Sequence, residues 1–215
     1  GALGTGDRVG QHWTGAPDAW QDLTIEQLLN HTSRLAHPWK LGGFEAQMMV
    51  PREMDEVLRG YADEPLRHEP GTAYSYSGVG YLTLARIIEE VSGQSYHRYL
   101  RDAIFEPLGM DSTDGDRPER IIANRASGYE VVDGALRNAT AIYLPILTGG
   151  GDLHSSLSDM QRWHAALAAG ELLSESAYER MWTPGLNDYG YGWRIMTHGD
   201  LSMAMHTGGL PGFSA

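Results

Sequence analysis

Apolar residues recur at helical spacing through the middle of the chain, most regularly in the segment VGYLTLARIIEEVSG at positions 79–93. An amphipathic helix places such residues on one face, three or four positions apart. Gly93 suits the left-handed position that follows the last turn of many helices. The residues expected on the buried stripe of this helix are Tyr81, Leu84, Ala85, Ile88 and Val91.

Less regular helical spacing of apolar residues predicts two helices before this one and one after it. TIEQLLNHTSRL begins with Thr24 followed by Gln27, which is the spacing of a capping box. A short helix over about 51–61 follows Pro51, a residue type favoured in the first helical turn. A further helix starts at Ser95 and runs to about residue 104.

Two more helices follow the glycine-rich loop TGGGDLHSS. The first has capping-box spacing at Ser158 and Gln161 and ends at Gly170. The second covers about 174–182. Residues 1–23 and 36–50 have no regular period and are expected to be irregular.

Two segments have the alternation that is typical of hairpin strands. YEVVDGALRN carries an Asp-Gly pair between apolar flanks, and the second segment alternates on both sides of THGD at 197–200. A mostly helical lobe over about 24–182, followed by a hairpin over about 189–209, predicts an α+β protein. We expect the helical lobe to pack against part of an antiparallel sheet, in a single domain over 1–215.

Composition and charge narrow the possible partners. Hydrophobic residues make up 41% of the chain and charged residues 20%, as in ordinary globular proteins. No run of eighteen apolar residues exists, so no segment is expected to span a membrane. The net charge of −12 and the lack of a basic stripe argue against nucleic-acid binding.

Two residue counts limit the chemistry. The chain has no cysteine, which excludes disulfides, zinc–thiolate sites and a cysteine nucleophile within it. Lys40 is the single lysine among 16 basic residues. Any mechanism that needs a lysine must therefore use Lys40 or a lysine from outside these residues.

Tyr76 is the first candidate for chemistry, because the stretch PGTAYSYSGVGY places it on a loop directly before the main helix. A tyrosine acts as a general base only when nearby cations lower its pKa, which is near 10 when free. That requires a lysine or a protonated histidine close by; otherwise Tyr76 is a packing residue. The tyrosines expected only to pack are Tyr74, Tyr81, Tyr96 and Tyr99.

The sequence His-Thr-Gly-Gly at the end of the last predicted strand is the second candidate. His206 or Thr207 can hold a polar group of a substrate, and Gly208 and Gly209 let a substrate approach the strand edge. A backbone N–H there can serve as one donor of an oxyanion hole. The alternative is a structural or simply exposed histidine.

The remaining polar residues point to no metal or cofactor. The other histidines lack spacing such as His-Glu-x-x-His, and we expect His31 to be a capping or core residue of its helix. Asp152 and Asp159 flank the glycine-rich loop, and helix capping explains them.

Five ordered segments together resemble the serine β-lactamase-related hydrolases, which include class C β-lactamases, D,D-peptidases (penicillin-binding proteins), esterases and D-aminopeptidases. LTIEQLLNHTSRL is similar to the family's segment ending in His-Thr-Ser-Gly-Leu, with Arg34 at the usual glycine. PGTAYSYSGVGYLTLARIIEEVSG resembles the segment with the Tyr-x-Asn motif. IFEPLGMDST and GGGDLHSSLSDMQRW resemble the next two segments. YGYGWRI with MHTGGLPGFSA resembles the strand pair that ends in Lys-Thr-Gly, in its His-x-Gly variant.

The resemblance implies a β-lactamase/transpeptidase-like fold and acyl transfer through serine. In that reaction a Ser-x-x-Lys serine attacks a carbonyl, and the lysine and a tyrosine relay the proton. By position, Tyr76 matches the motif tyrosine, and His206 and Gly208 match the third motif, with Thr207 between them. The N–H of Gly209 is then an oxyanion-hole donor.

Two departures from the family pattern qualify this implication. No Ser-x-x-Lys exists in the chain, since His37 stands three places before Lys40. We therefore expect a fragment whose nucleophile segment and closing strands lie outside it, and which is inactive alone. Gly78 stands where the family usually has asparagine. This either favours an ester-like or relaxed substrate choice over amides and β-lactams, or marks a Tyr-Ser-Gly subgroup with its own geometry.

Two rival hypotheses remain. A non-catalytic relative would use the same cleft to bind peptides or another ligand. A plain α+β interaction domain would have no such cleft, with Tyr76 and His206 on opposite faces. The compartment stays open, although the resemblance favours the periplasm or secretion.

Overall fold

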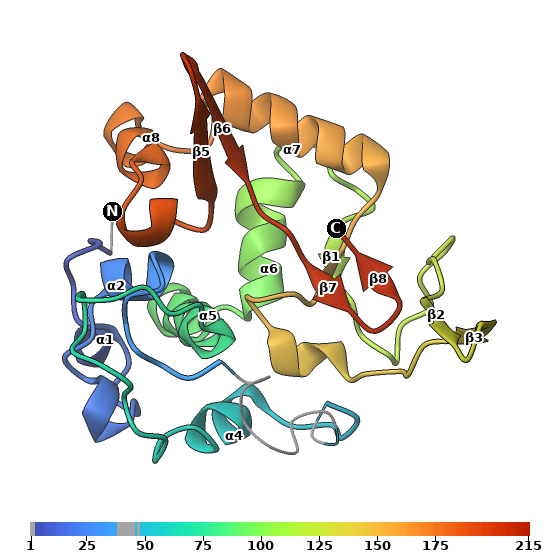
Figure 1. Ribbon diagram of the computed structural model, residues 1–215, viewed down its shortest axis with the longest axis horizontal. Helices are drawn as coiled ribbons and strands as arrows, with labels where there is room; N and C mark the ends of the chain where they lie inside the picture. Colours follow the sequence, from blue (N-terminus) through green and yellow to red (C-terminus); the bar gives the residue numbers. More distant parts are fainter. Residues whose placement is uncertain (1–2, 38–45, 47) are drawn as a thin grey trace.

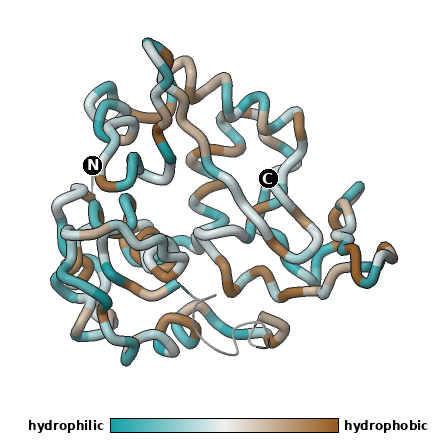
Figure 2. The backbone as a smooth tube through the Cα atoms, in the orientation of Figure 1, coloured by the Kyte–Doolittle hydropathy of each residue, from teal (hydrophilic) through white to brown (hydrophobic). Residues whose placement is uncertain are grey.

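Helix α5 (Gly78–Ser92) is the central element of the computed structural model, which describes residues 3–37, 46 and 48–215 (Figure 1). The helices in contact with it are α1 (Val9–His12), α2 (Ile25–Leu29), α4 (Met54–Arg59) and α6 (Tyr96–Leu100). Buried hydrophobic residues of α1, α2, α4 and α5 belong to one core cluster, and Figure 2 shows the hydrophobic stretches of the chain in this region. Among the described residues, no helix has both the length and the apolar character needed to cross a membrane.

The remaining helical segments are α7 (Leu157–Ala169), α8 (Glu175–Trp182), the π-helical turn η3 (Arg101–Phe105), and the 3₁₀ turns η1 (Asp18–Trp20), η4 (Leu144–Leu147) and η5 (Leu186–Asp188). The strands form antiparallel pairs. These pairs are β1 (Asp114–Gly115) with β4 (Leu153–His154), β2 (Tyr129–Val132) with β3 (Ala135–Asn138), β5 (Arg194–His198) with β6 (Leu201–Met205), and β7 (Gly209–Leu210) with β8 (Phe213–Ser214).

The prediction of the main helix is confirmed, but the prediction of its buried stripe is wrong in detail. Ser77 is the N-cap residue and Gly93 ends the helix with φ 69°. Of the predicted stripe only Ala85 is fully buried, and the other four residues are half-buried. The fully buried residues are Val79, Gly80, Leu82, Thr83, Ala85 and Ile87. Because helices pack on α5 from several sides, its buried surface is wider than one stripe.

The first predicted helix begins as expected and ends early. Thr24 and Gln27 form the predicted capping box, with the Gln27 N–H donating to Thr24 Oγ1 at 3.2 Å. The helix ends at Leu29, so His31 lies outside it in a turn with φ 58°. The placement of His31 within the helix was therefore wrong, while its prediction as a core residue is confirmed by a 1% exposed side chain.

Two other helix starts differ from prediction. The helix after Pro51 begins at Met54, so this proline precedes the helix rather than forming its first turn. Helix α7 is capped by Ser156, whose Oγ accepts the Asp159 N–H at 3.2 Å, and not by Ser158. Several serines suit a cap before α7, whereas Glu53, the N-cap residue of α4, makes no side-chain cap, so the local sequence does not fix either start to the residue.

Both predicted hairpins are present. Asp133 and Gly134 connect β2 and β3 with φ 52° and 74°, the left-handed pair that a tight hairpin requires. The β5–β6 hairpin pairs Arg194 with Met205, so His206 follows directly after the paired strand.

Arg34 has a left-handed backbone, which gives a physical reason for the glycine usual at this position in the family that the sequence resembles. Its φ is 74°, a conformation that glycine adopts freely and that costs other residues about 1–2 kcal/mol. The guanidinium offsets part of this cost, since Arg34 Nη2 donates to the Leu66 carbonyl oxygen at 2.7 Å.

We predict that Arg34→Gly is less destabilising than Arg34→Ala. Both variants lose the hydrogen bond to Leu66, but alanine keeps the unfavourable backbone conformation and glycine removes it. The expected difference in the free energy of unfolding is about 1 kcal/mol in favour of glycine. Urea unfolding of the complete gene product measures it, and an alanine variant at least as stable as the glycine variant would contradict this account of Arg34.

Candidate active site

Tyr76 is held in place by the start of helix α5. Ser77, the next residue, is fully buried: its Oγ accepts the Gly80 N–H at 3.2 Å and donates to the Ala36 carbonyl oxygen at 2.9 Å. This serine therefore serves as a helix cap and cannot be an accessible nucleophile. It fixes the backbone next to Tyr76, whose own ring is half-buried.

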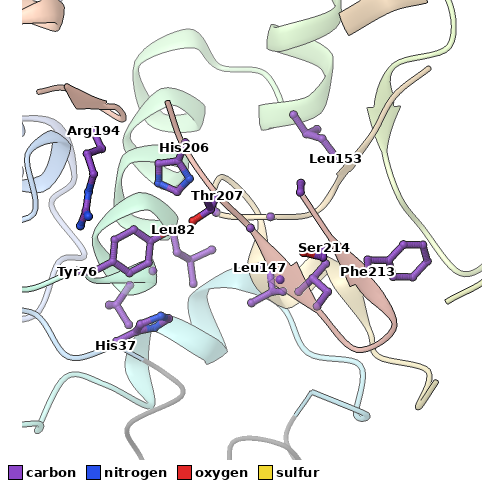
Figure 3. Close-up of a pocket in the computed structure, with 18 of the residues that line it drawn as sticks. His37, Tyr76, Leu82, Leu147, Leu153, Arg194, His206, Thr207, Phe213 and Ser214 are labelled. Atoms are coloured by element: carbon purple, nitrogen blue, oxygen red, sulfur yellow. The ribbon is translucent and has the colours of Figure 1, made fainter. Parts of the chain in front are cut away.

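A cavity of about 1160 Å³ opens beside Tyr76, and all the predicted site residues line it. They are Tyr76, Gly78, His206, Thr207, Gly208 and Gly209. The ring centroids of Tyr76 and His206 are 5.9 Å apart, and Figure 3 shows Tyr76 between His206 and His37. The prediction that Tyr76 and His206 lie on opposite faces, made for a plain interaction domain, is therefore wrong.

The surroundings of Tyr76 favour its protonated form. Burial raises the pKa of the Tyr76 hydroxyl, and the nearby Tyr74 raises it further. The general-base role considered from the sequence needs a cation that lowers this pKa, and Lys40 lies outside the described residues. With the groups described, the Tyr76 hydroxyl keeps its proton at neutral pH.

Three imidazoles surround the Tyr76 ring. Its centroid lies 4.2 Å from that of His31, 5.1 Å from that of His37 and 5.9 Å from that of His206. Burial, together with His206 and His37, lowers the pKa of His31 to about 3. The ring directly under Tyr76 is therefore neutral, whereas His206 is exposed to solvent.

The strand β7 presents a backbone N–H toward the cavity side. Gly208 exchanges both backbone hydrogen bonds with Ala215, at 2.9 and 3.0 Å. Hydrogen-bonded and non-hydrogen-bonded pairs alternate along an antiparallel ladder, so the next pair, Gly209 with Ser214, is the non-hydrogen-bonded kind. The Gly209 N–H therefore points away from β8, and Gly209 lines the cavity. Among the described residues, no atom lies within 4 Å of where a Cβ on Gly209 would stand.

Arg194 and Tyr74 line the same cavity, and sequence reasoning missed both. Tyr74 was expected only to pack, but it lines the cavity close to the exposed Arg194 side chain, whose charge acts on its hydroxyl. Arg194 thus adds a positive charge to the cavity wall near His206 (Figure 3). The alternation of apolar and polar residues predicted strand β5, but it did not indicate that Arg194, the first residue of that strand, would line a cavity.

The glycine-rich loop forms another wall of the cavity through Gly150 and Gly151. A Cβ on Gly149, whose φ is 79°, would stand 2.7 Å from the Tyr81 carbonyl oxygen, so only glycine lets the loop lie this close to α5. Asp152 does not cap a helix as expected, because its buried carboxylate bonds His97 Nε2 at 2.6 Å.

Asp159 lies in the first turn of α7 but does not cap it, since Ser156 is the cap; its carboxylate instead ties the helix to a neighbouring turn. Its Oδ2 accepts the Ser112 N–H at 2.8 Å and the Thr113 hydroxyl at 2.9 Å. In the part of the chain that the structure describes, no three histidine, aspartate or glutamate side chains group as metal ligands.

Comparison with known proteins identifies relatives over the whole chain. A family model described as Beta-lactamase matches residues 1–215. Penicillin-binding protein 4* of Bacillus subtilis is 33% identical over 243 positions, which cover 100% of this chain and 52% of that protein. The chain therefore spans about half the length of this relative.

Solved structures agree with this fold. A D-stereospecific amidohydrolase from Streptomyces superposes with a TM-score of 0.86 at 21% identity, over 99% of this chain and 70% of that one. The D-amino acid amidase of Ochrobactrum anthropi, solved with L-phenylalanine amide, has a TM-score of 0.80 at 27% identity, over 100% of this chain and 65% of that one. The predicted α+β, β-lactamase/transpeptidase-like fold is thereby confirmed.

We predict that His31 makes the protein sensitive to mild acid. Its pKa is near 6.5 in the unfolded chain and about 3 in the fold, so below pH 6.5 the unfolded state binds a proton that the folded state excludes. This contribution to stability is complete above about pH 6.5 and is lost progressively as the pH falls toward 3.

The matched comparison is with His31→Asn, which does not titrate. The stability advantage of the native protein over this variant should shrink by about 2 kcal/mol between pH 7 and pH 5. Urea unfolding of both proteins at the two pH values measures this change. An advantage that stays constant would mean that His31 is not buried in its neutral form.

Proposed function

Because the chain belongs to the Beta-lactamase family, we propose that the complete gene product is a serine hydrolase that works through an acyl-enzyme. The observation that carries the proposal is the meeting of Tyr76, His206 and the Gly209 N–H around one cavity. These groups come from two segments more than a hundred residues apart in the sequence. Acyl transfer needs a proton donor, a polar group that holds the substrate and an N–H donor for the oxyanion, all facing the same cavity.

The proposed reaction has two steps. A serine Oγ attacks the substrate carbonyl carbon and gives its proton to a basic neighbour, while the carbonyl oxygen, now negative, accepts the Gly209 N–H. The bond to the leaving group then breaks as the Tyr76 hydroxyl donates a proton to that group, and the protonated neighbour passes the proton it took from serine to the Tyr76 oxygen, which restores both groups. Water attacks the resulting ester in the same way and releases the acid and the serine.

The nucleophile comes from residues other than these 215 in this proposal. No serine in the chain stands three places before a lysine, and the Ser77 hydroxyl beside Tyr76 is buried in a cap. A relative of which this chain covers 52% leaves room for such a segment in the complete protein. The serine and its lysine would then supply the cation that lets Tyr76 relay protons.

The substrate in this proposal is a small ester, peptide or lactam. Gly78 contributes no side-chain amide to the cavity, which weakens selection for an amide bond and favours esters or a broad choice. The exposed Arg194 beside His206 can pair with a free carboxylate of the substrate.

We predict that Tyr76→Phe lowers kcat of the complete gene product by about 10²–10⁴-fold, because the donor to the leaving group is lost. Tyr99→Phe is the matched control, since that tyrosine is exposed on α6 away from the cavity. Turnover of an activated ester measures both. A Tyr76→Phe enzyme as active as the control would remove Tyr76 from the mechanism.

The same assay addresses the non-catalytic alternative, which the absence of Ser-x-x-Lys from the chain favours. A ligand-binding relative would bind a peptide in the cavity without turning over esters, amides or lactams. Binding without turnover by the complete gene product would replace the hydrolase proposal with this one.

We predict that Arg194→Gln discriminates between charged and neutral substrate ends. Loss of a charge-assisted hydrogen bond should lower kcat/KM for a peptide with a free terminal carboxylate by about tenfold or more, with much less effect on its terminal amide. Arg137→Gln on the exposed strand β3 is the control. Equal losses on both substrates would contradict the carboxylate role.

A further inference from the structure

His31 holds the backbone on both sides of Tyr76. Its carbonyl oxygen accepts the Ser75 N–H at 2.8 Å, and its ring Nδ1 accepts the Ser77 N–H at 3.2 Å. Ser77 is extended, with φ −140° and ψ 115°. In extended backbone, alternate N–H groups point to the same side, so these two bonds fix the rotation of the chain about its own axis. The direction of the Tyr76 side chain follows from that rotation.

The ring of His31 also supports the Tyr76 ring. Their centroids are 4.2 Å apart with the planes inclined at 46°, and the His31 side chain is 1% exposed. The left-handed turn at His31, with φ 58°, lets its carbonyl oxygen and its ring contact the same short segment. Such a conformation is uncommon outside glycine and is found where the surrounding structure maintains it.

One tautomer of the His31 ring is required for this arrangement. A backbone N–H can only donate, so Nδ1 must be unprotonated to accept from Ser77. The ring proton of the neutral form is then on Nε2, which lies 3.2 Å from the Tyr189 hydroxyl. With its proton on Nε2, the ring donates to the Tyr189 oxygen, which therefore accepts.

We infer that His31 is a positioning residue for Tyr76: its carbonyl oxygen and unprotonated Nδ1 hold Ser75 and Ser77, and the Tyr189 oxygen accepts the proton that this tautomer carries on Nε2. The inference rests on the proposed role of Tyr76 as a proton donor and relay. His31 touches no reacting atom in this account. It sets the direction of the hydroxyl that does, and small errors in such placement lower rates strongly.

Two substitutions in the complete gene product distinguish the contributions of the two ring nitrogens of His31. In His31→Asn the amide oxygen stands close to the position of Nδ1 and can accept from Ser77. In His31→Gln the longer side chain reaches toward Tyr189 and leaves the Ser77 N–H without its acceptor. Each variant replaces the ring and keeps one of its two hydrogen bonds, so thermal unfolding of both is the control for stability.

The expected result is a kcat for His31→Gln at least about tenfold below that for His31→Asn, with KM values of the two within about threefold. Equal kcat values for the two variants would overturn the inference. Tyr76→Phe is measured alongside them. If that variant keeps full activity, the proposed function of Tyr76 fails; if it is inactive while the two His31 variants are equal, only the positioning role fails.

A measurement on the native protein covers the case in which these variants do not fold. Side-chain ¹⁵N NMR at pH 5 should find His31 neutral, with its proton on Nε2, when exposed histidines are largely protonated. Tyr189→Phe, which removes only the accepting hydroxyl, should introduce the Nδ1-protonated form and lower kcat. A native ring protonated on Nδ1 or on both nitrogens would overturn the inference.

Discussion

The last residue of α2 and the turn that follows it, residues 29–32, hydrogen-bond both segments that line the cavity. The Leu29 carbonyl oxygen accepts the Tyr81 hydroxyl at 2.7 Å and the Gly192 N–H at 3.3 Å, and Thr32 accepts the Gly71 N–H at 2.9 Å. His31 adds its bonds to the loop that carries Tyr76. Each buried bond contributes about 1 kcal/mol, and an orphaned partner costs about 1–3 kcal/mol. One short turn therefore ties the Tyr76 loop to the segment that enters β5, and through β6 to His206.

The two sides of Tyr76 differ. The neutral, buried imidazole of His31 packs against one side, and the open cavity with His206, Thr207 and the glycines of β7 lies on the other. Burial raises the pKa of Tyr76, so Tyr76 can act as a base only when a nearby cation lowers that pKa. In the proposed function, the lysine of the nucleophile segment supplies this cation.

The sequence predicted the elements whose signals are local. The Thr24 capping box, the Asp133-Gly134 turn and the Gly93 helix end each depend on a few neighbouring residues, and each is present in the structure. The motifs at Tyr76 and His206 were also found, because short segments carry them. What they do stays a prediction.

The features that the sequence did not reveal depend on contacts between distant segments. Helix α2 ends at Leu29 because His31 is drawn into bonds with Ser75, Ser77 and Tyr189, none of which a local period records. The buried surface of α5 is wide because several helices cover it. Arg194 reaches the cavity only once β5 is packed beside Tyr74.

Acyl transfer in this cavity is the central claim, and the mass of the complete gene product tests it most directly. The protein would be mixed with an activated ester and, separately, with a penicillin, quenched in acid, and mapped by peptide mass. The account predicts one covalent acyl group on a serine of a Ser-x-x-Lys segment outside these 215 residues. No adduct with either compound, or an adduct on a serine within the chain described here, would contradict it.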